Sequence, residues 1–205
     1  MDLIFYILIG GLFVFNVISF FRNRKSDNFV YKIVFFSRHT DWLLAILLVV
    51  FVITLAVIVE PLVPQFLKWS LFSLIGKDGT NANVEIINQS LNISPIILII
   101  VFAFLLLFLP KVAYWEEVRF RYGITKINSK AILTNLKFGL YHCLVGVPIW
   151  IGLLLGVVGF IFSLIYIHQY KKSNDLTIAV HSSTSLHGKY NIILIVLLII
   201  TLIKP

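Results

Sequence analysis

Residues 138–167 read FGLYHCLVGVPIWIGLLLGVVGFIFSLIYI, thirty positions without Asp, Glu, Lys or Arg. One helix needs only about 20 apolar residues to cross the hydrocarbon core of a bilayer. Gly146 and Pro148 interrupt this run, and both residues favour a break in a helix. We therefore expect a helix over about 130–145, a tight break, and a second helix over about 149–168.

The composition of the whole chain agrees with a membrane protein. Of 205 residues, 60% are hydrophobic and 13% are charged, which is more apolar surface than a soluble domain of this size buries. An isolated apolar segment in lipid must satisfy its own backbone, so the spans should be helices. The net charge of +8 gathers between apolar runs, which favours a topological role over nucleic-acid binding.

The apolar runs predict an all-α, polytopic membrane bundle of about six or seven transmembrane helices. We divide it into an N-terminal region, 1–93, with two spans and an exposed loop, and a core, 94–205. Besides the pair above, the expected spans are 2–21, 42–59, 94–109 (kinked or ended by Pro110), 176–187 and 191–203. An interfacial helix is expected near 65–75 and an exposed loop over 76–92. Gly152, Gly156 and Gly159 have the small-residue spacing that lets helices approach closely in lipid.

Basic residues indicate the orientation in the membrane. Eleven Lys and Arg lie in the blocks 22–41 and 111–137, whereas 60–93 holds two. Loops rich in Lys and Arg stay on the cytoplasmic side, which places both blocks there and the N-terminus outside. The first apolar run precedes its positive charges, unlike a secretory signal, so we interpret it as a retained span.

The candidate site begins at EEVRFR, residues 116–121. On a helix, Glu117 and Arg121 are four residues apart and can pair, which leaves Glu116 free. Ionisable groups at membrane depth are costly and are functional candidates by default. His142 and His181, which lie in two separate apolar segments, are the expected companions of Glu116.

A glutamate with two histidines suits the activation of water. Glu116 would act as general base, and His142 would hold the same water. His181, with Ser185 one turn on, would donate hydrogen bonds to the developing oxyanion. Phe138, one turn before His142, would orient the imidazole by packing. The cofactor is therefore none or a divalent metal such as zinc, which Glu116, His142 and His181 would bind; the absence of a His-Glu-x-x-His spacing favours metal-free chemistry.

The order Glu-Glu-x-x-x-Arg, Phe-x-x-x-His and a third His segment resembles the CPBP family of intramembrane proteases. That family contains the CAAX prenyl proteases and bacterial relatives linked to bacteriocin processing or immunity. The resemblance covers about residues 109–191. It implies an intramembrane peptidase in a bacterial cytoplasmic (inner) membrane, with Glu116, His142 and a third-motif histidine at its site.

The third motif has two possible placements. The family has His-x-x-x-Asn or Asp, whereas His181 is followed at the fourth position by Ser185; His187 with Asn191 fits these letters. We expect His181 to complete the site, because an apolar lead-in precedes it and His187 lies beside Gly188-Lys189. Six residues separate the two histidines, which puts them on different faces of one helix.

Two classes of function remain open. One is an endopeptidase that hydrolyses a membrane-associated peptide or protein in the lipid bilayer, without a nucleic-acid partner. The other is a non-catalytic membrane immunity or scaffold protein of the same fold. The first two motifs favour the enzyme, and the departure at Ser185 favours the alternative.

Overall fold

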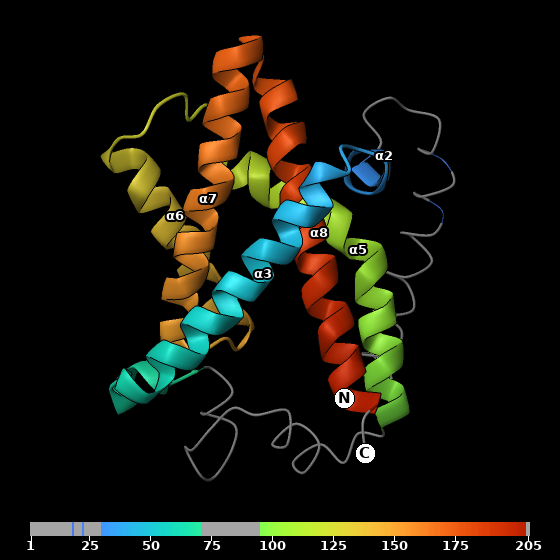
Figure 1. Cartoon of the computed structure of the whole chain (residues 1–205), viewed down its shortest axis with the longest axis vertical. Coiled ribbons are helices and arrows are strands. Elements are labelled where there is room, and N and C mark those ends of the chain that lie inside the picture. The colour runs from blue at the N-terminus through green and yellow to red at the C-terminus, as the bar shows by residue number, and fades with distance from the viewer. Residues whose placement is uncertain (1–17, 19–21, 23–29, 71–94, 204–205) are drawn as a thin grey trace.

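The computed structural model describes Ile18, Arg22, residues 30–70 and residues 95–203. Within these ranges the chain forms helices joined by turns, without a strand, which confirms the all-α class (Figure 1). The elements in chain order are α2 (Val30–Phe35), α3 (Thr40–Val59), η1 (Glu60–Leu62), η2 (Gln65–Lys68), α5 (Pro95–Arg121), α6 (Ser129–Tyr141), η4 (His142–Val145), α7 (Ile149–Ser173) and α8 (Leu176–Ile203).

Three of the described helical segments are long and apolar enough to cross a membrane: Thr40–Leu62, Ile149–Ser173 and Leu176–Thr201. This is fewer than the six or seven spans expected from the sequence. The expected first span at 2–21 falls, apart from Ile18, outside the described residues, as do the expected loop 76–92 and the later part of the expected helix 65–75. The earlier part of that helix is the short 3-10 helix η2. The expected loop 22–41 is in part wrong, because it contains α2.

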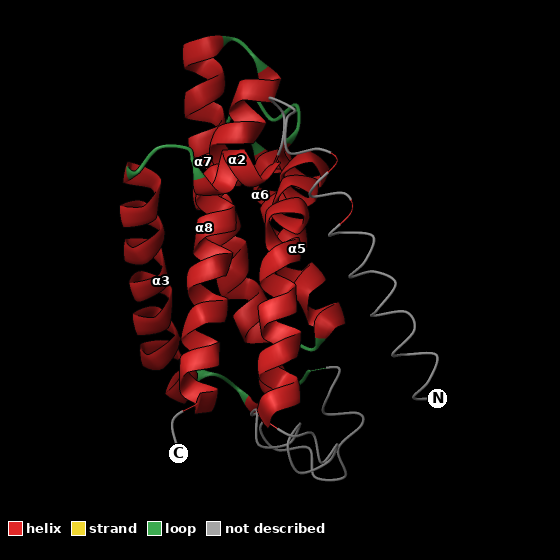
Figure 2. Ribbon diagram, turned by 90° about the vertical axis from the view of Figure 1, so that its right-hand side faces the viewer, coloured by secondary structure: helices red, strands yellow, loops and turns green. Residues whose placement is uncertain are grey.

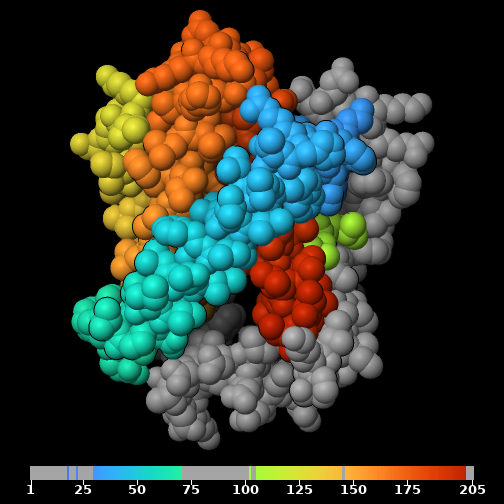
Figure 3. Space-filling model, viewed as in Figure 1, coloured from blue at the N-terminus to red at the C-terminus, as the bar shows by residue number. Residues whose placement is uncertain are grey.

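Helix α8 is the centre of the bundle. It packs against α2, α3, α5 and α7, while α6 lies on the far side of α7. Figure 2 shows α3 standing beside α8, and Figure 3 shows it crossing the face formed by α7 and α8. One buried apolar cluster joins α3, α7 and α8 through side chains that include Val49, Phe162 and Leu186.

The expectation of two helices over 176–187 and 191–203 is wrong, because α8 is continuous for 28 residues. Gly188 and Lys189, which suggested a polar end, are both buried. A Cβ at Gly188 would lie 2.6 Å from Cγ2 of Val34, so glycine lets α2 approach α8. The Lys189 ammonium has hydrogen-bond partners on the bend between α2 and α3.

Helix α5 continues through Pro110 instead of ending there. Proline has no N–H and disturbs the helical hydrogen bonds one turn earlier. In that turn the Tyr31 hydroxyl donates to the Leu107 carbonyl oxygen at 2.6 Å, so α2 supplies a donor next to the irregularity. Burial raises the pKa of Tyr31, which keeps the hydroxyl protonated as a donor. Residues 116–121 are therefore helical, and Glu117, Phe120 and Arg121 point into the bundle.

The predicted pair of helices around Gly146 and Pro148 is confirmed, and the second helix extends five residues beyond its expected end. Asn128 caps α6 by accepting from the Ala131 N–H. Gly146 has φ of 90°, a conformation that side chains other than glycine rarely adopt. The turn places α6 alongside the N-terminal half of α7.

Glycines hold α6 and α7 close together, as their spacing predicted. A Cβ on Gly139 would lie 2.1 Å from the carbonyl oxygen of Gly152, whereas one on Gly156 would be 3.3 Å from its nearest neighbour. Gly139→Ala should therefore push the two helices apart and destabilise the fold by about 1–3 kcal/mol.

Thermal unfolding in detergent tests this prediction, with Gly156→Ala as the matched control. Gly139→Ala should lower the Tm clearly more than Gly156→Ala does. Equal Tm values for the two variants would show that the close approach of α6 and α7 is not what limits the substitution.

Candidate functional site

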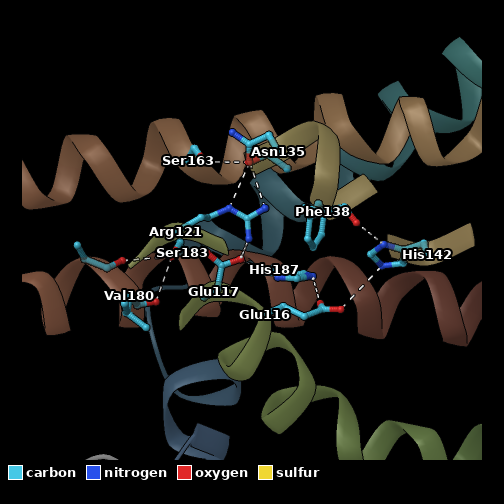
Figure 4. A network of polar contacts seen from close by, with 12 residues as sticks. Glu116, Glu117, Arg121, Asn135, Phe138, His142, Ser163, Val180, Ser183 and His187 are labelled. Carbon is cyan, nitrogen blue, oxygen red and sulfur yellow. Dashed lines mark hydrogen bonds and ion pairs between the residues drawn. The ribbon is translucent and has the colours of Figure 1, made fainter. Parts of the chain in front are cut away.

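The Glu117–Arg121 pair predicted from the sequence is confirmed. Nη1 of Arg121 lies 2.6 Å from Oε1 of Glu117, and both side chains are fully buried. Nε and Nη2 of Arg121 donate to the Gly159 carbonyl oxygen at 3.3 and 3.2 Å. The guanidinium also lies over the Phe138 ring, 4.5 Å from its centroid. This pair ties the end of α5 to α6 and α7 (Figure 4).

Gly159 is the third glycine of the small-residue series, and it makes room for this contact. A Cβ there would lie 2.6 Å from the Phe138 ring and 3.0 Å from Nη2 of Arg121. Its carbonyl oxygen then accepts from a charged donor, which is among the stronger hydrogen bonds in proteins. Close helix packing and the buried charge pair thus depend on the same position.

His187 of α8 lies between the two glutamates. Its Nδ1 is 2.7 Å from Oε1 of Glu117, and its Nε2 is 3.3 Å from Oε2 of Glu116. The ring stacks on Phe162 at 4.5 Å between centroids and meets the Phe138 ring edge-on at 5.6 Å. Packing and hydrogen bonding together fix the orientation of this imidazole.

The partners of His187 determine which nitrogen carries a proton. The carboxylate of Glu117, already paired with Arg121, can only accept, so Nδ1 of His187 must be the donor. In a neutral imidazole, Nε2 is then an acceptor that faces Glu116. The 3.3 Å contact brings Nε2 within ion-pair distance of Oε2 of Glu116, an oxygen without a hydrogen-bond partner among the described residues.

His142 approaches Glu116 from the end of α6. Its Nδ1 is 2.9 Å from the Phe138 carbonyl oxygen, which can only accept, so Nδ1 is the donor here too. Its Nε2 is 4.0 Å from Oε1 of Glu116. This separation is too long for a direct hydrogen bond and is suited to a bridging water. The Phe138 ring meets His142 edge-on at 5.0 Å, as its packing role predicted.

Glu116 and His142 are the accessible members of this group. The side chain of His142 is 25% exposed and that of Glu116 is 14% exposed, whereas His187 is 2% exposed and Glu117 is fully buried. The expectation that Glu117 is occupied and Glu116 is available agrees with these contacts. A molecule that reaches this group meets Glu116 and His142 first.

The expected contact of His181 with Glu116 and His142 is not formed. The His181 ring lies instead beside Tyr114, at 6.2 Å between centroids, and its Nε2 has no hydrogen-bond partner among the described residues. His181 and His187 lie on different faces of α8, as their spacing predicts, but the helix does not end at His187. Since α8 runs to Ile203, His187 is the histidine near its middle.

Ser185 and Asn191, the residues four positions after His181 and His187, also lie on different faces of α8. Ser185 lies on another face of α8, where its hydroxyl is hydrogen-bonded to Ser37, Asp41 and Lys189. Asn191 is one turn after His187, on the same side of α8, and is partly buried. The structure thus groups Glu116, His142 and His187, the alternative placement, and leaves His181 and Ser185 apart from them.

The sequence-based metal set of Glu116, His142 and His181 does not come together. More generally, the described part of the chain has no group of three or more His, Cys, Asp or Glu side chains suited to a metal ion. Nδ1 of His187 is used by Glu117 and Nδ1 of His142 by a backbone carbonyl, which leaves Nε2 of each ring facing Glu116. The cofactor prediction of none or a divalent metal stays a prediction, and the chemistry proposed below is written with side chains.

Comparisons of the chain with protein-family models, with curated proteins and with solved structures find no match.

Proposed function

We propose that this protein is an intramembrane endopeptidase in which Glu116 activates water for attack on a peptide bond. The observation that carries the proposal is the position of Glu116 between two imidazoles whose other nitrogens have fixed partners. Such prior orientation is what general acid–base catalysis requires, and it contributes typically about 10²–10⁴-fold to a rate.

In the proposed reaction, a water lies between Oε1 of Glu116 and Nε2 of His142. Glu116, as a carboxylate, takes a proton from this water. The water oxygen attacks the peptide carbonyl carbon, and the carbonyl oxygen becomes an oxyanion. Glu116 then gives its proton to the leaving amine nitrogen as the C–N bond breaks. The oxygen of the water thus ends in the new carboxyl group, and the proton taken by Glu116 ends on the new amine.

His187 and its neighbours hold the base in this reaction. Glu117 and Arg121 form a neutral buried pair that fixes Nδ1 of His187 and so directs Nε2 at Glu116. Asn191, one turn along α8, would donate its amide N–H to the oxyanion. This role is an extension of the family resemblance, in which a histidine is followed by Asn four residues later.

The motif resemblance supports the same proposal. With His187 and Asn191 as the third motif, all three motifs of the CPBP family are present in order, and the departure at Ser185 no longer counts against catalysis. We accordingly propose a bacterial cytoplasmic membrane protein of this family, acting on a membrane-associated peptide or protein. The basic residues at the C-terminal end of α5 and in α6 favour a site near the cytoplasmic face.

The first test is a search for new peptide termini in membranes of cells that make the wild-type protein or Glu116→Gln. The substitution keeps the size of the side chain and removes the base. We expect a set of cleaved membrane peptides with the wild-type protein that is absent with Glu116→Gln. Identical termini in both, with equal amounts of folded protein, would instead support the non-catalytic immunity or scaffold function.

A further inference from the structure

A second polar cluster lies on the face of α8 that looks toward α2 and α3. Its centre is Lys189, whose fully buried ammonium is 2.8 Å from Oγ of Ser37 and 2.9 Å from Oγ of Ser185. It also donates to the Arg38 carbonyl oxygen at 3.1 Å and lies 3.7 Å from Oδ2 of Asp41. The ammonium thus has three hydrogen-bond acceptors, and its charge compensates the charge of Asp41. Neither side chain takes part in the proposed hydrolysis.

A pocket of about 190 Å³ lies next to this cluster. Its polar lining includes Ser37, Arg38, Asp41, Gln169, His181 and Ser185, which come from the α2–α3 bend, the end of α7 and the start of α8. These three segments meet where α2 and α3 pack on α8 (Figure 1). The pocket is therefore formed by packing of elements far apart in sequence.

The charges around the pocket favour an anion. The Asp41 carboxylate is already engaged by Ser185 and by Lys189. Arg38 is exposed, and its side chain makes a long hydrogen bond, 3.5 Å from Nη2 to Oε1 of Gln169. His181 adds a buried Nε2 without a hydrogen-bond partner in the part of the chain that the structure describes. The lining thus has one cation and one ring nitrogen still available for a ligand.

The position of the pocket indicates where that anion comes from. Gln169 is four residues before the end of α7, and His181 is five residues after the start of α8. At 1.5 Å per residue, the pocket lies within about 8 Å of the α7–α8 turn. The headgroup region is about 5–8 Å deep on each side of a bilayer.

We propose that this pocket binds a phosphate group, supplied by the headgroup of an anionic phospholipid. The Arg38 guanidinium has the fork of donors that phosphate oxygens accept, and His181 supplies the second contact. Bound there, the phosphate connects the α2–α3 bend to α7 and α8. This site lies on the opposite face of α8 from His187, so it does not depend on the proposed hydrolysis.

The test is a titration of the detergent-purified protein with dihexanoyl phosphatidylglycerol, following the rise in Tm that binding to the folded state produces. Dihexanoyl phosphatidylcholine and inorganic phosphate form the other two arms. Arg38→Gln should weaken phosphatidylglycerol binding at least about tenfold, the effect of losing one charged hydrogen bond. Lys171→Gln is the matched control, because it removes an exposed charge at the same end of the bundle without touching the pocket.

Saturable binding of phosphatidylglycerol that is lost in Arg38→Gln and kept in Lys171→Gln supports the site. If inorganic phosphate alone gives the same saturable rise in Tm, the phosphate chemistry holds and free phosphate is the ligand. Equal weakening in both variants would show general attraction to negative charge and overturn the proposal. Absence of saturable binding by the wild-type protein would overturn it as well.

Discussion

Replacement of His187 by alanine is expected to lower the rate of peptide cleavage by about 10²–10⁴-fold, the range typical of a proton-transfer partner. His187 contacts both glutamates, so its loss removes the imidazole that faces Glu116 and one hydrogen-bond partner of Glu117. His181→Ala should leave the rate nearly unchanged, since His181 makes no contact with Glu116. The measurement is the cleavage rate of a peptide found in the termini search, with each variant in lipid vesicles.

His187→Gln separates a structural role from a chemical one. Glutamine can still hydrogen-bond to Glu117 but cannot share a proton with Glu116. We expect this variant to keep the Tm of the wild-type protein more closely than His187→Ala and to remain inactive. Loss of activity in His181→Ala, with His187→Ala active, would return the site to His181 and Ser185 and contradict the assignment made from the structure.

Arg121→Met should be the most destabilising single substitution near the site, by about 3–5 kcal/mol. Removing one partner of a buried ion pair leaves the other charge without compensation in a medium of low dielectric constant. Glu117 would lose its charged partner and keep its contact with His187, and the Gly159 carbonyl oxygen would lose both side-chain donors. Thermal unfolding in detergent measures the effect, and Arg119→Met, an exposed neighbour on the same helix, is the control.

A double variant gives the Arg121 prediction a second test. Glu117→Gln combined with Arg121→Met leaves no buried charge at the pair, so it should be more stable than Arg121→Met alone. If Arg121→Met and Arg119→Met unfold at the same temperature, the pair does not contribute to stability as its burial indicates.

The parts of the fold that the sequence predicted depend on local signals. The break between α6 and α7 follows from Gly146 and Pro148, and α3 follows from a charge-free run of apolar residues. The close approach of α6 and α7 follows from the spacing of small residues in α7. Each of these features is determined by residues near one another in the chain.

The length of α8 could not be predicted in the same way. Gly188 and Lys189 look like a helix end because glycine is common just after a helix and lysine is usually exposed. They are buried because Val34, Ser37 and Asp41, about 150 residues earlier, pack around them. A lysine inside an apolar run requires a partner across the bundle, and this was the signal that the sequence offered.

In the candidate site, too, the local contact was predictable from the sequence and the long-range contact was not. The Glu117–Arg121 pair is a contact within one turn of helix, so the sequence was sufficient to predict it. The choice between His181 and His187 depends on which face of α8 meets α5. That face is determined by the packing of α8 against α2, α3, α5 and α7. A local sequence pattern carries no information about this packing.

The most direct test of the central claim is the cleavage rate of Glu116→Gln relative to the wild-type protein. Both would be purified, reconstituted in lipid vesicles and given the same peptide, in water labelled with ¹⁸O. We predict that the wild-type protein places one ¹⁸O in the new carboxyl terminus and that Glu116→Gln is slower by at least about 100-fold. Equal rates for the two proteins would contradict the assignment of Glu116 as the base that activates water.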